Sequence, residues 1–296
     1  MLNMFRCFRM KEQKLKPEDY LYVILPYFNY CGFQRRKQLF LEFLDRIKQE
    51  KRVRVIISEA AERGVEFDLP FRKDVFLHLR FETESRIWLK ESLINIAINT
   101  LPKDWKYVAW LDADITFINN NWVDETIECL QDRDVVQLFQ TCINLGPEGE
   151  VIKTDRGFCY MHLRSGKEYT KTYKYGFWHP GYAWACTRAA YVAMDGLIDW
   201  GILGSGDHHM ALALINKVQS SHPGNIHKEY KHRLNKFEDR VRSFKIGFTN
   251  GTILHHWHGR LEDRKYRERW EILTTNEYNP SLDIEKNSLG LVQLTR

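Results

Sequence analysis

Several short segments in the first half of the sequence are apolar at nearly every position, rather than at every second one. A strand that is apolar on both faces must be covered on both faces, as in a parallel sheet flanked by helices. These segments are residues 20–29, 53–58, 75–81, 107–111 and 134–140. Between them, residues 36–51 and 84–101 repeat apolar side chains at helical spacing. The sequence therefore predicts an α/β fold with a mostly parallel sheet and helices on both faces.

The second half of the sequence differs in character, and the change falls near residue 145. It is rich in aromatic residues and glycine. Elements are expected at 186–194 and from Asp207 onward (helices), 227–245 (a basic amphipathic helix), 251–260 (a strand ending in a loop) and 261–273 (a charged helix). No linker separates the halves, so residues 1–145 and 146–296 are expected to form one continuous globular domain.

The bulk properties narrow the range of partners and compartments. The net charge is +5 and the pI is about 8.8, which is compatible with a polyanionic ligand. The sequence contains no apolar run of about eighteen residues, the length of a membrane span, and its first residues carry too many charges for a signal peptide. Six cysteines are scattered without a C-x-x-C pair, so we expect reduced thiols and a cytoplasmic protein.

The apolar segment YVAWL ends at two aspartates, Asp112 and Asp114. Ligands of open α/β sheets bind beyond the carboxyl ends of the strands, where Asn29 and Glu59 also fall. Two converging carboxylates repel each other unless a cation lies between them. Oxygen ligands suit Mg²⁺ or Mn²⁺, completed by water and by phosphate oxygens of a substrate. The pair indicates a divalent-metal site; the alternative is a helix N-cap beside a surface acid.

Three histidines, His255, His256 and His258, lie within four residues of one another. If the segment is a strand, His256 and His258 share one face. Neutral imidazole binds Mn²⁺ and similar metals, so one of these histidines is a candidate third ligand beside the aspartates. The alternative is a set of buried, hydrogen-bonded histidines.

Asp207 follows two glycines in GSGDHH, where the backbone can approach a ligand closely. A carboxylate kept ionised at a helix N-terminus is a plausible general base, and the alternative is a plain N-cap. Lys90 is a candidate contact to phosphate or sugar. Arg260 begins a basic loop suited to closing over a diphosphate. Four aromatic residues are candidate stacking platforms for a sugar or base: Tyr175, Trp178, Tyr182 and Trp184.

These motifs together resemble those of a known family. LPYFN, the acid after the second strand and WLDADITF are similar to motifs of the GT-A nucleotide-sugar glycosyltransferases. GILGSGDHHMALALI resembles the glycine-rich stretch with a catalytic acid in galactosyltransferase-like members, and HHWHGR resembles their last metal ligand before a flexible loop. The motifs are also similar to those of family 2-like glycosyltransferases from bacterial and phage genomes. The resemblance implies a GT-A, Rossmann-like fold, with residues 1–145 binding the nucleotide sugar and residues 146–296 binding the acceptor and completing the metal site.

The resemblance also implies roles for individual residues. Asp112 and Asp114 would hold Mn²⁺ (or Mg²⁺) on the diphosphate of a UDP-sugar, with His258 as third ligand and His256 as the alternative. Asp207 would deprotonate the acceptor hydroxyl in an inverting transfer of a hexosyl or pentosyl group. The remaining donor contacts would come from Pro26, Tyr27 and Asn29 around uridine, Glu59 at the base or ribose, and Lys90 and Arg260. The family's Gly-Glu-Asp motif is Gly-Asp-His here, so one acid is missing.

The acceptor and the oligomeric state are not specified by these motifs. A cell-surface or capsular glycan and a hydroxylated base in phage DNA both fit, and the basic helix at 227–245 favours DNA. Two other classes compete with the glycosyltransferase. One is a metal-dependent nucleotidyltransferase or phosphohydrolase, although no G-x-G phosphate loop supports it. The other is a non-catalytic protein that binds sugar or nucleic acid.

Overall fold

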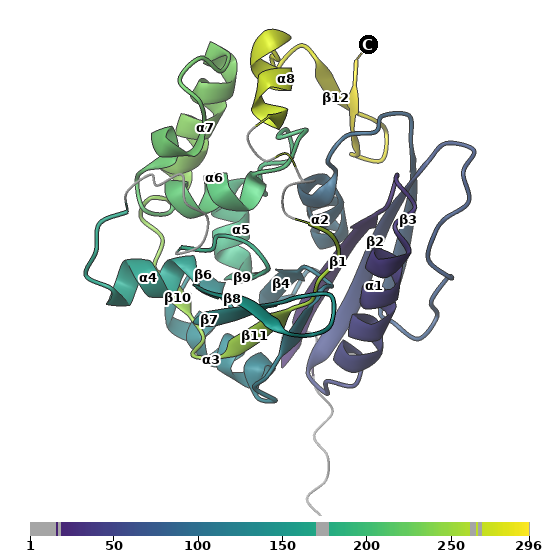
Figure 1. The fold of residues 1–296 in the computed structure, drawn as a ribbon, viewed down its shortest axis with the longest axis vertical. Helices are drawn as coiled ribbons and strands as arrows, with labels where there is room; N and C mark the ends of the chain where they lie inside the picture. The colour runs from purple at the N-terminus through teal and green to yellow at the C-terminus, as the bar shows by residue number, and fades with distance from the viewer. Residues whose placement is uncertain (1–15, 17–18, 170–177, 261–264, 266–267, 296) are drawn as a thin grey trace, which may run out of the picture.

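The computed structural model describes residues 16, 19–169, 178–260, 265 and 268–295. Its largest sheet has seven strands, with helices on both faces (Figure 1). In spatial order the strands are β10 (Ile246–Phe248), β6 (Val135–Gln137), β9 (Ala183–Thr187), β4 (Tyr107–Leu111), β1 (Leu21–Phe28), β2 (Val53–Glu62) and β3 (Leu77–Thr83). Neighbouring strands pair in parallel except β9, which is antiparallel to both β4 and β6. The predicted α/β fold with a mostly parallel sheet is confirmed.

Both faces of this sheet are buried, as strands that are apolar throughout require. Along β1, Leu21, Val23 and Leu25 belong to one core cluster, and Tyr22 and Ile24 belong to the other. The first cluster is covered by α1 (Gln34–Ile47) and α3 (Trp122–Asp132). The second is covered by α2 (Lys90–Asn99), α5 (Arg188–Met194), α6 (Gly206–Ala213) and α7 (Lys228–Val241).

The centre of the sheet is held by a pair of tryptophans. Trp110 of β4 and Trp184 of β9 are paired positions, and each is at most 1% exposed. Truncating a buried aromatic side chain of this size to alanine costs about 3–5 kcal/mol. Trp184 therefore belongs to the core, and its predicted role as a stacking platform is wrong.

A smaller sheet brings the segment with the two aspartates next to the segment with the histidines. Its order is β5 (Ile115–Phe117), β11 (Thr252–His255), β7 (Thr141–Leu145) and β8 (Val151–Arg156), and it lies in front of the main sheet in the view of Figure 1. Because β11 is antiparallel to β5 with His255 opposite Ile115, His255 comes next to Asp114. Strands from before and after residue 145 share both sheets.

The remaining elements cover the edges. They are α4 (Phe158–Arg164), the 3₁₀ helix η2 (Val218–Ser221), α8 (Arg269–Thr275) and the hairpin β12 (Ile284–Lys286) with β13 (Val292–Leu294). The hairpin is tied to the N-terminal side of α2, because the amides of Val292 and Leu294 donate to the hydroxyls of Ser92 and Ser85 at 3.1 and 3.0 Å. Within the described part of the chain, none of the helices has the length and apolarity needed to cross a membrane.

The main error of the sequence-based elements concerns β9. Residues 186–194 were expected to be helical throughout, but Cys186 and Thr187 end β9 and the helix begins at Arg188. Thr187 is the N-cap of α5, and its side chain accepts a hydrogen bond from the amide of Ala190. Of the helix predicted at 261–273, residues 261–264, 266 and 267 lie outside the described residues, and α8 starts at Arg269.

Candidate active site

A cleft of about 1110 Å³ opens beyond the carboxyl ends of β1 and β4. This is where an open α/β sheet places its ligands. Eight of the predicted site residues line it: Pro26, Tyr27, Lys90, Asp112, Asp114, Asp207, His258 and Arg260. Three others, Asn29, Glu59 and His256, are described but do not line it. The cleft therefore collects residues that are as much as 244 positions apart in the sequence (Pro26 to Trp270).

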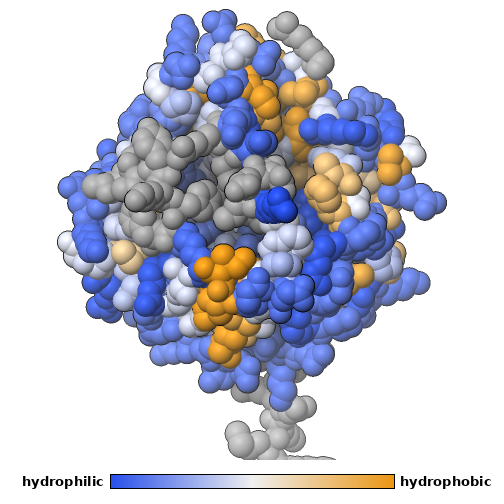
Figure 2. Space-filling view, in the orientation of Figure 1, coloured by the Kyte–Doolittle hydropathy of each residue, from blue (hydrophilic) through white to orange (hydrophobic). Residues whose placement is uncertain are grey.

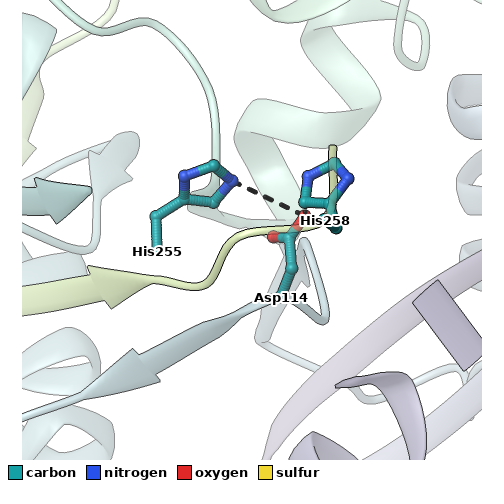
Figure 3. A group of neighbouring side chains, drawn as sticks. All are labelled: Asp114, His255 and His258. Atoms are coloured by element: carbon teal, nitrogen blue, oxygen red, sulfur yellow. Dashed lines mark ion pairs between the residues drawn. The ribbon is translucent and has the colours of Figure 1, made fainter. Parts of the chain in front are cut away.

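Asp114, His255 and His258 form a compact cluster on one side of the cleft (Figure 3). Each offers one ligand atom, and these atoms all lie within 4.8 Å of one another. The Asp114 Oδ2 atom is 2.8 Å from His258 Nε2 and 3.7 Å from His255 Nε2. Burial alone would raise the pKa of Asp114, but the two imidazoles outweigh it and hold that pKa well below its usual range. The cluster has the donor set and size of a divalent-metal site.

Two buried atoms of this cluster have no hydrogen-bond partner in the described part of the chain and suit a bound cation. Asp114 Oδ1 and His255 Nε2 are buried, and neither has a hydrogen-bond partner among the described residues. Buried polar atoms are nearly always satisfied, because leaving one unpaired costs about 1–3 kcal/mol. A carboxylate oxygen and an imidazole nitrogen within one cluster are what Mn²⁺ would satisfy. The residues present therefore fit such an ion.

The identity of the histidine ligands differs from the expectation. The prediction that His256 and His258 share one strand face is wrong, because β11 ends at His255 and the chain beyond it is irregular. His256 turns away from the cluster, and its Nε2 atom lies 2.8 Å from the hydroxyl of Thr116. Its neighbour His255, to which the resemblance assigned no role, lies beside Asp114.

Asp112 lies in a second cluster, on the other side of Ala113, around the buried ammonium group of Lys90. The Lys90 Nζ atom is 2.7 Å from Asp112 Oδ1 and 2.8 Å from Asp207 Oδ2. Lys90 opens α2 and its side chain is only 8% exposed. Burial would lower the pKa of Lys90, but Asp112, Asp207 and Glu91 outweigh it and raise that pKa well above its usual range. Lys90 is therefore a fixed cation between two carboxylates.

The surroundings of Asp112 oppose its ionisation. Burial raises the pKa of its carboxyl group, and the charges of Asp114 and Asp207 add to this effect, while Lys90 works against it. The compact cluster found among the described residues contains Asp114 but not Asp112. In this structure the two aspartates therefore face different groups, since Asp112 faces Lys90 and Asp114 faces the two histidines.

Asp207 reaches the cleft from the first turn of α6 and is not its N-cap. Ser205 holds the N-cap position with a positive φ of 76°, and its hydroxyl accepts from Arg269 at 3.0 Å. The next residue, Gly206, leaves room for the side chain of Glu91. A Cβ atom at position 206 would come within 2.2 Å of the Glu91 carboxylate. The glycine-rich turn thus lets α6 approach α2 closely enough for Asp207 to reach Lys90.

Glu91 is a cleft residue without a definite predicted role. It is 5% exposed, and the indole N–H of Trp88 donates to its Oε2 atom at 3.0 Å. Burial raises the pKa of Glu91 to about 8, with a further contribution from Asp207. A carboxyl group that titrates near neutral pH, close to Asp207, is chemically suited to hold or accept a proton. The only signal in the sequence was a run of polar residues opening a helix that is otherwise apolar.

On the β1 side of the cleft, Tyr27 is held from behind by a residue that the sequence reasoning missed. Its hydroxyl donates to Asp68, which also accepts from Asn29 at 2.9 Å and pairs with Lys37 at 3.0 Å. Asn29 thus supports Tyr27 through Asp68 instead of lining the cleft. Asp68 lies in the β2–β3 connection, so nothing in the local sequence marks it.

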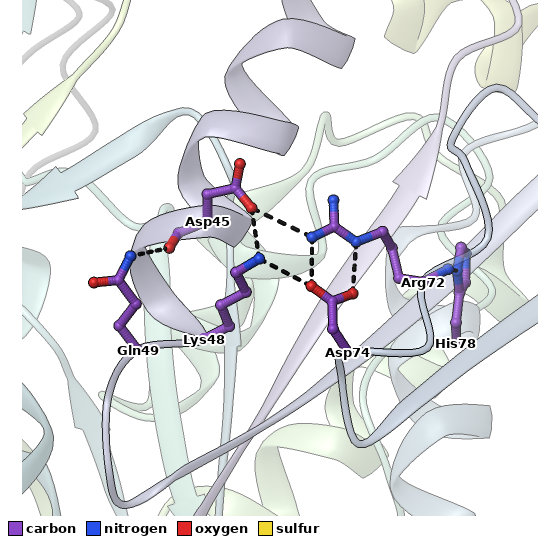
Figure 4. A network of polar contacts seen from close by, with 6 residues as sticks. All are labelled: Asp45, Lys48, Gln49, Arg72, Asp74 and His78. Atoms are coloured by element: carbon purple, nitrogen blue, oxygen red, sulfur yellow. Dashed lines mark hydrogen bonds and ion pairs between the residues drawn. The ribbon is translucent and has the colours of Figure 1, made fainter.

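The β2–β3 connection is fastened to α1 by a surface network (Figure 4). Arg72 and Lys48 each bridge the carboxylates of Asp45 and Asp74, at distances from 2.6 to 3.3 Å. Exposed pairs of this kind contribute about 0–1 kcal/mol each, so several together are needed to fix a loop. The network holds the connection that carries Asp68.

The side chain of Glu59 binds residues of the same connection and of β3. It is 1% exposed and accepts from the Leu69 amide at 2.8 Å, while its other oxygen lies 3.1 Å from His78 Nε2 and 3.3 Å from Arg80 Nε. The Arg72 amide donates to His78 Nδ1 (Figure 4), so His78 carries its proton on Nε2 and donates to Glu59. The expected contact between Glu59 and a nucleoside is not supported, because protein donors already occupy both oxygens.

Aromatic side chains line the rest of the cleft. Trp178 and Tyr182 line it as expected, and Tyr175 lies outside the described residues. Three tryptophans that were not predicted join them: Trp88, Trp257 and Trp270. Figure 2 shows a mainly hydrophilic face interrupted by hydrophobic patches. The partly exposed rings of Trp88, Trp257 and Trp270 suit the apolar faces of sugars or bases, whereas Trp178 and Tyr182 are largely buried.

Comparison with known proteins finds solved structures of similar arrangement, but no matching family model and no matching curated protein. Among solved structures, β1,4-galactosyltransferase 7 from Drosophila, in complex with manganese, UDP-Gal and xylobiose, is 12% identical with a TM-score of 0.42, covering 94% of this chain and 95% of its own. A nucleotide-diphospho-sugar transferase from Desulfovibrio desulfuricans G20 is 12% identical with a TM-score of 0.38, covering 88% and 96%.

A third similar structure is GalNAc-T7 with UDP, GalNAc and Mn²⁺. It is 11% identical with a TM-score of 0.43, and the match covers 81% of this chain and 44% of that one. At these identities and TM-scores the likeness is one of general arrangement. The chemistry of the cleft must therefore be judged from its own residues.

Proposed function

We propose that the protein is a metal-dependent glycosyltransferase that moves a hexosyl or pentosyl group from a UDP-sugar to an acceptor hydroxyl. The observation that carries the proposal is the Asp114–His255–His258 cluster, with its two unsatisfied atoms, in the same cleft as Asp207. A divalent cation and a carboxylate base facing one cleft are the parts that sugar transfer from a nucleoside diphosphate needs.

In this proposal Asp114, His255 and His258 hold Mn²⁺ or Mg²⁺. The bound ion would neutralise the charge that develops on the departing diphosphate. Lys90 adds a fixed positive charge beside the same leaving group, while Asp112 keeps Lys90 in place. Arg260, on the rim of the cleft, closes the phosphate side.

Asp207 is proposed to accept the proton of the acceptor hydroxyl. The hydroxyl oxygen then bonds to the anomeric carbon while the bond from that carbon to the diphosphate oxygen breaks, so that UDP leaves with the electron pair. Attack opposite the leaving group inverts the anomeric centre. Lys90 holds Asp207 at 2.8 Å, which fixes the position of this carboxylate at the cleft.

The two halves of the chain are proposed to bind different substrates. Pro26 and Tyr27, with Asn29 and Asp68 behind them, are proposed to receive the uridine in the first half. The second half, from residue 146, supplies Asp207, the two histidine ligands and the aromatic lining for the acceptor. The acceptor is a glycan or a hydroxylated base in DNA. DNA binding would weaken steeply with salt, whereas glycan binding would not.

The test begins with a thermal-shift screen of nucleotide sugars with and without Mn²⁺, followed by UDP release from the donor it identifies. The wild-type chain should release UDP only with Mn²⁺. Asp114→Asn and Asp112→Asn should each lose turnover, and His256→Asn should keep it because His256 faces Thr116. Full turnover by Asp112→Asn would refute the proposal. Hydrolysis of free nucleotides would instead indicate a phosphohydrolase, and metal-independent binding without turnover would indicate a binding protein.

A further inference from the structure

Next to the Asp114–His255–His258 cluster lies a partly buried amide, Asn144 of β7, whose orientation is fixed by its neighbours. Its Nδ2 atom donates to Asp155 Oδ2 at 3.0 Å and to the Lys153 carbonyl at 3.4 Å. Carboxylate and carbonyl oxygens only accept, so the NH₂ group must point toward them. Asp155 is 3% exposed and its other oxygen pairs with Lys153 at 2.8 Å.

This orientation turns the amide oxygen of Asn144 toward the cleft. The Oδ1 atom accepts from the Tyr182 hydroxyl at 3.1 Å and lies 3.0 Å from His255 Nδ1. Because an amide oxygen cannot donate, the proton of this second hydrogen bond must belong to His255 Nδ1. The network therefore selects one tautomer of His255.

The selected tautomer has a consequence at the opposite ring nitrogen. With the proton on Nδ1, the Nε2 atom of neutral His255 carries a free lone pair, and it is the atom that faces Asp114 and lacks a hydrogen-bond partner. If the amide were flipped, NH₂ would face Nδ1 and the proton would move to Nε2, where it would block a cation. Groups behind a metal-binding histidine commonly fix its tautomer and orientation in this way.

We propose that Asn144, oriented by Asp155, is a positioning residue that keeps His255 ready to bind a divalent cation. The inference rests on the proposed function, because it assigns a role at the same metal site. It adds two residues, Asn144 and Asp155, from the β7–β8 hairpin, which lie in none of the motifs that suggested the site.

The test measures Mn²⁺ affinity of the full chain by calorimetry, together with ¹⁵N NMR of the imidazole nitrogens without metal. Asn144→Leu should weaken Mn²⁺ binding about 10–100-fold. In the wild type, NMR should show His255 protonated on Nδ1 and not on Nε2. Thr116→Val is the matched control, since it removes one hydrogen bond from the neighbouring His256 and should leave the affinity unchanged.

An exchange of the two side chains separates positioning from general damage to the fold. Asn144→Asp alone places two carboxylates against each other, and Asp155→Asn alone releases the amide, so each should weaken binding. The double variant restores an acceptor toward His255 and a donor behind it, and should recover most of the affinity. Equal Mn²⁺ affinity in Asn144→Leu and wild type, or a proton on Nε2 in wild type, would overturn the inference. Absence of Mn²⁺ binding by wild type with the Nδ1 tautomer intact would overturn the proposed function instead.

Discussion

Asp112 and Asp114 are two residues apart and identical in chemistry, yet their surroundings differ in every respect. Asp112 faces a buried lysine, and its pKa is raised; Asp114 faces two histidines, and its pKa is lowered. The first cluster already contains its cation, whereas the second has unsatisfied ligand atoms. A D-x-D motif therefore need not be one site with two equal ligands. Here it joins a built-in positive charge to the proposed site for an external one.

The largest effect should come from the cluster that lacks a cation. Asp114→Asn removes the central carboxylate between the histidines, so Mn²⁺-dependent UDP release should fall on the order of 1000-fold. The control is Asp124→Asn, the same change at an exposed carboxylate paired with Arg52. Comparable rates for the two variants, measured with the donor found by screening, would remove the functional distinction between the clusters.

The next effect concerns stability in the lysine cluster. Lys90→Met leaves Asp112 and Asp207 without their counter-charge, which should cost about 3 kcal/mol in urea unfolding. Arg86→Met, at an exposed pair with Glu62, should cost far less because solvent screens that pair. Mn²⁺ should not restore the stability of Lys90→Met. If it does, the two clusters behave as one cation site and the comparison fails.

A smaller effect should appear in the pH dependence of stability. The pKa of Glu91 is raised to about 8, so the folded protein retains a proton that the unfolded chain releases near pH 4.5. Its stabilising contribution is complete below about pH 4.5 and is lost as the pH rises to about 8. Glu91→Gln should remove this decline, gaining on the order of 2 kcal/mol relative to wild type between pH 5 and 7. Parallel pH profiles for the two proteins would contradict a buried protonated Glu91.

The smallest effect should come from the histidine between the ligands. His256→Asn should change Mn²⁺ affinity by less than about twofold, because its ring contacts Thr116 and not Asp114. His255→Asn, one residue away, should weaken binding at least tenfold. A reversal of these two results, measured by calorimetry, would make His256 rather than His255 the metal ligand.

The sequence predicted those features that depend on local pattern. Strands apolar on both faces required a covered, mostly parallel sheet, and Asp112 and Asp114 were located at its carboxyl edge because they directly follow β4. The predicted His258 does lie in the cluster, but the place of His255 was not predicted, because the end of β11 at His255 depends on pairing with β5 and β7. Lys90 was a candidate, but its place between two carboxylates depends on α2 meeting α6. Asp68 and Asn144 had no local signal, since long-range hydrogen bonds alone bring them to the site.

The most direct test of the difference between the two aspartates is the position of Mn²⁺ in a crystal soaked with that ion, located by anomalous scattering. We predict one peak bonded to Asp114, His255 and His258, with Lys90 still between Asp112 and Asp207. A peak between Asp112 and Asp207 with Lys90 displaced, or no peak in the cleft, would contradict the assignment of the metal site.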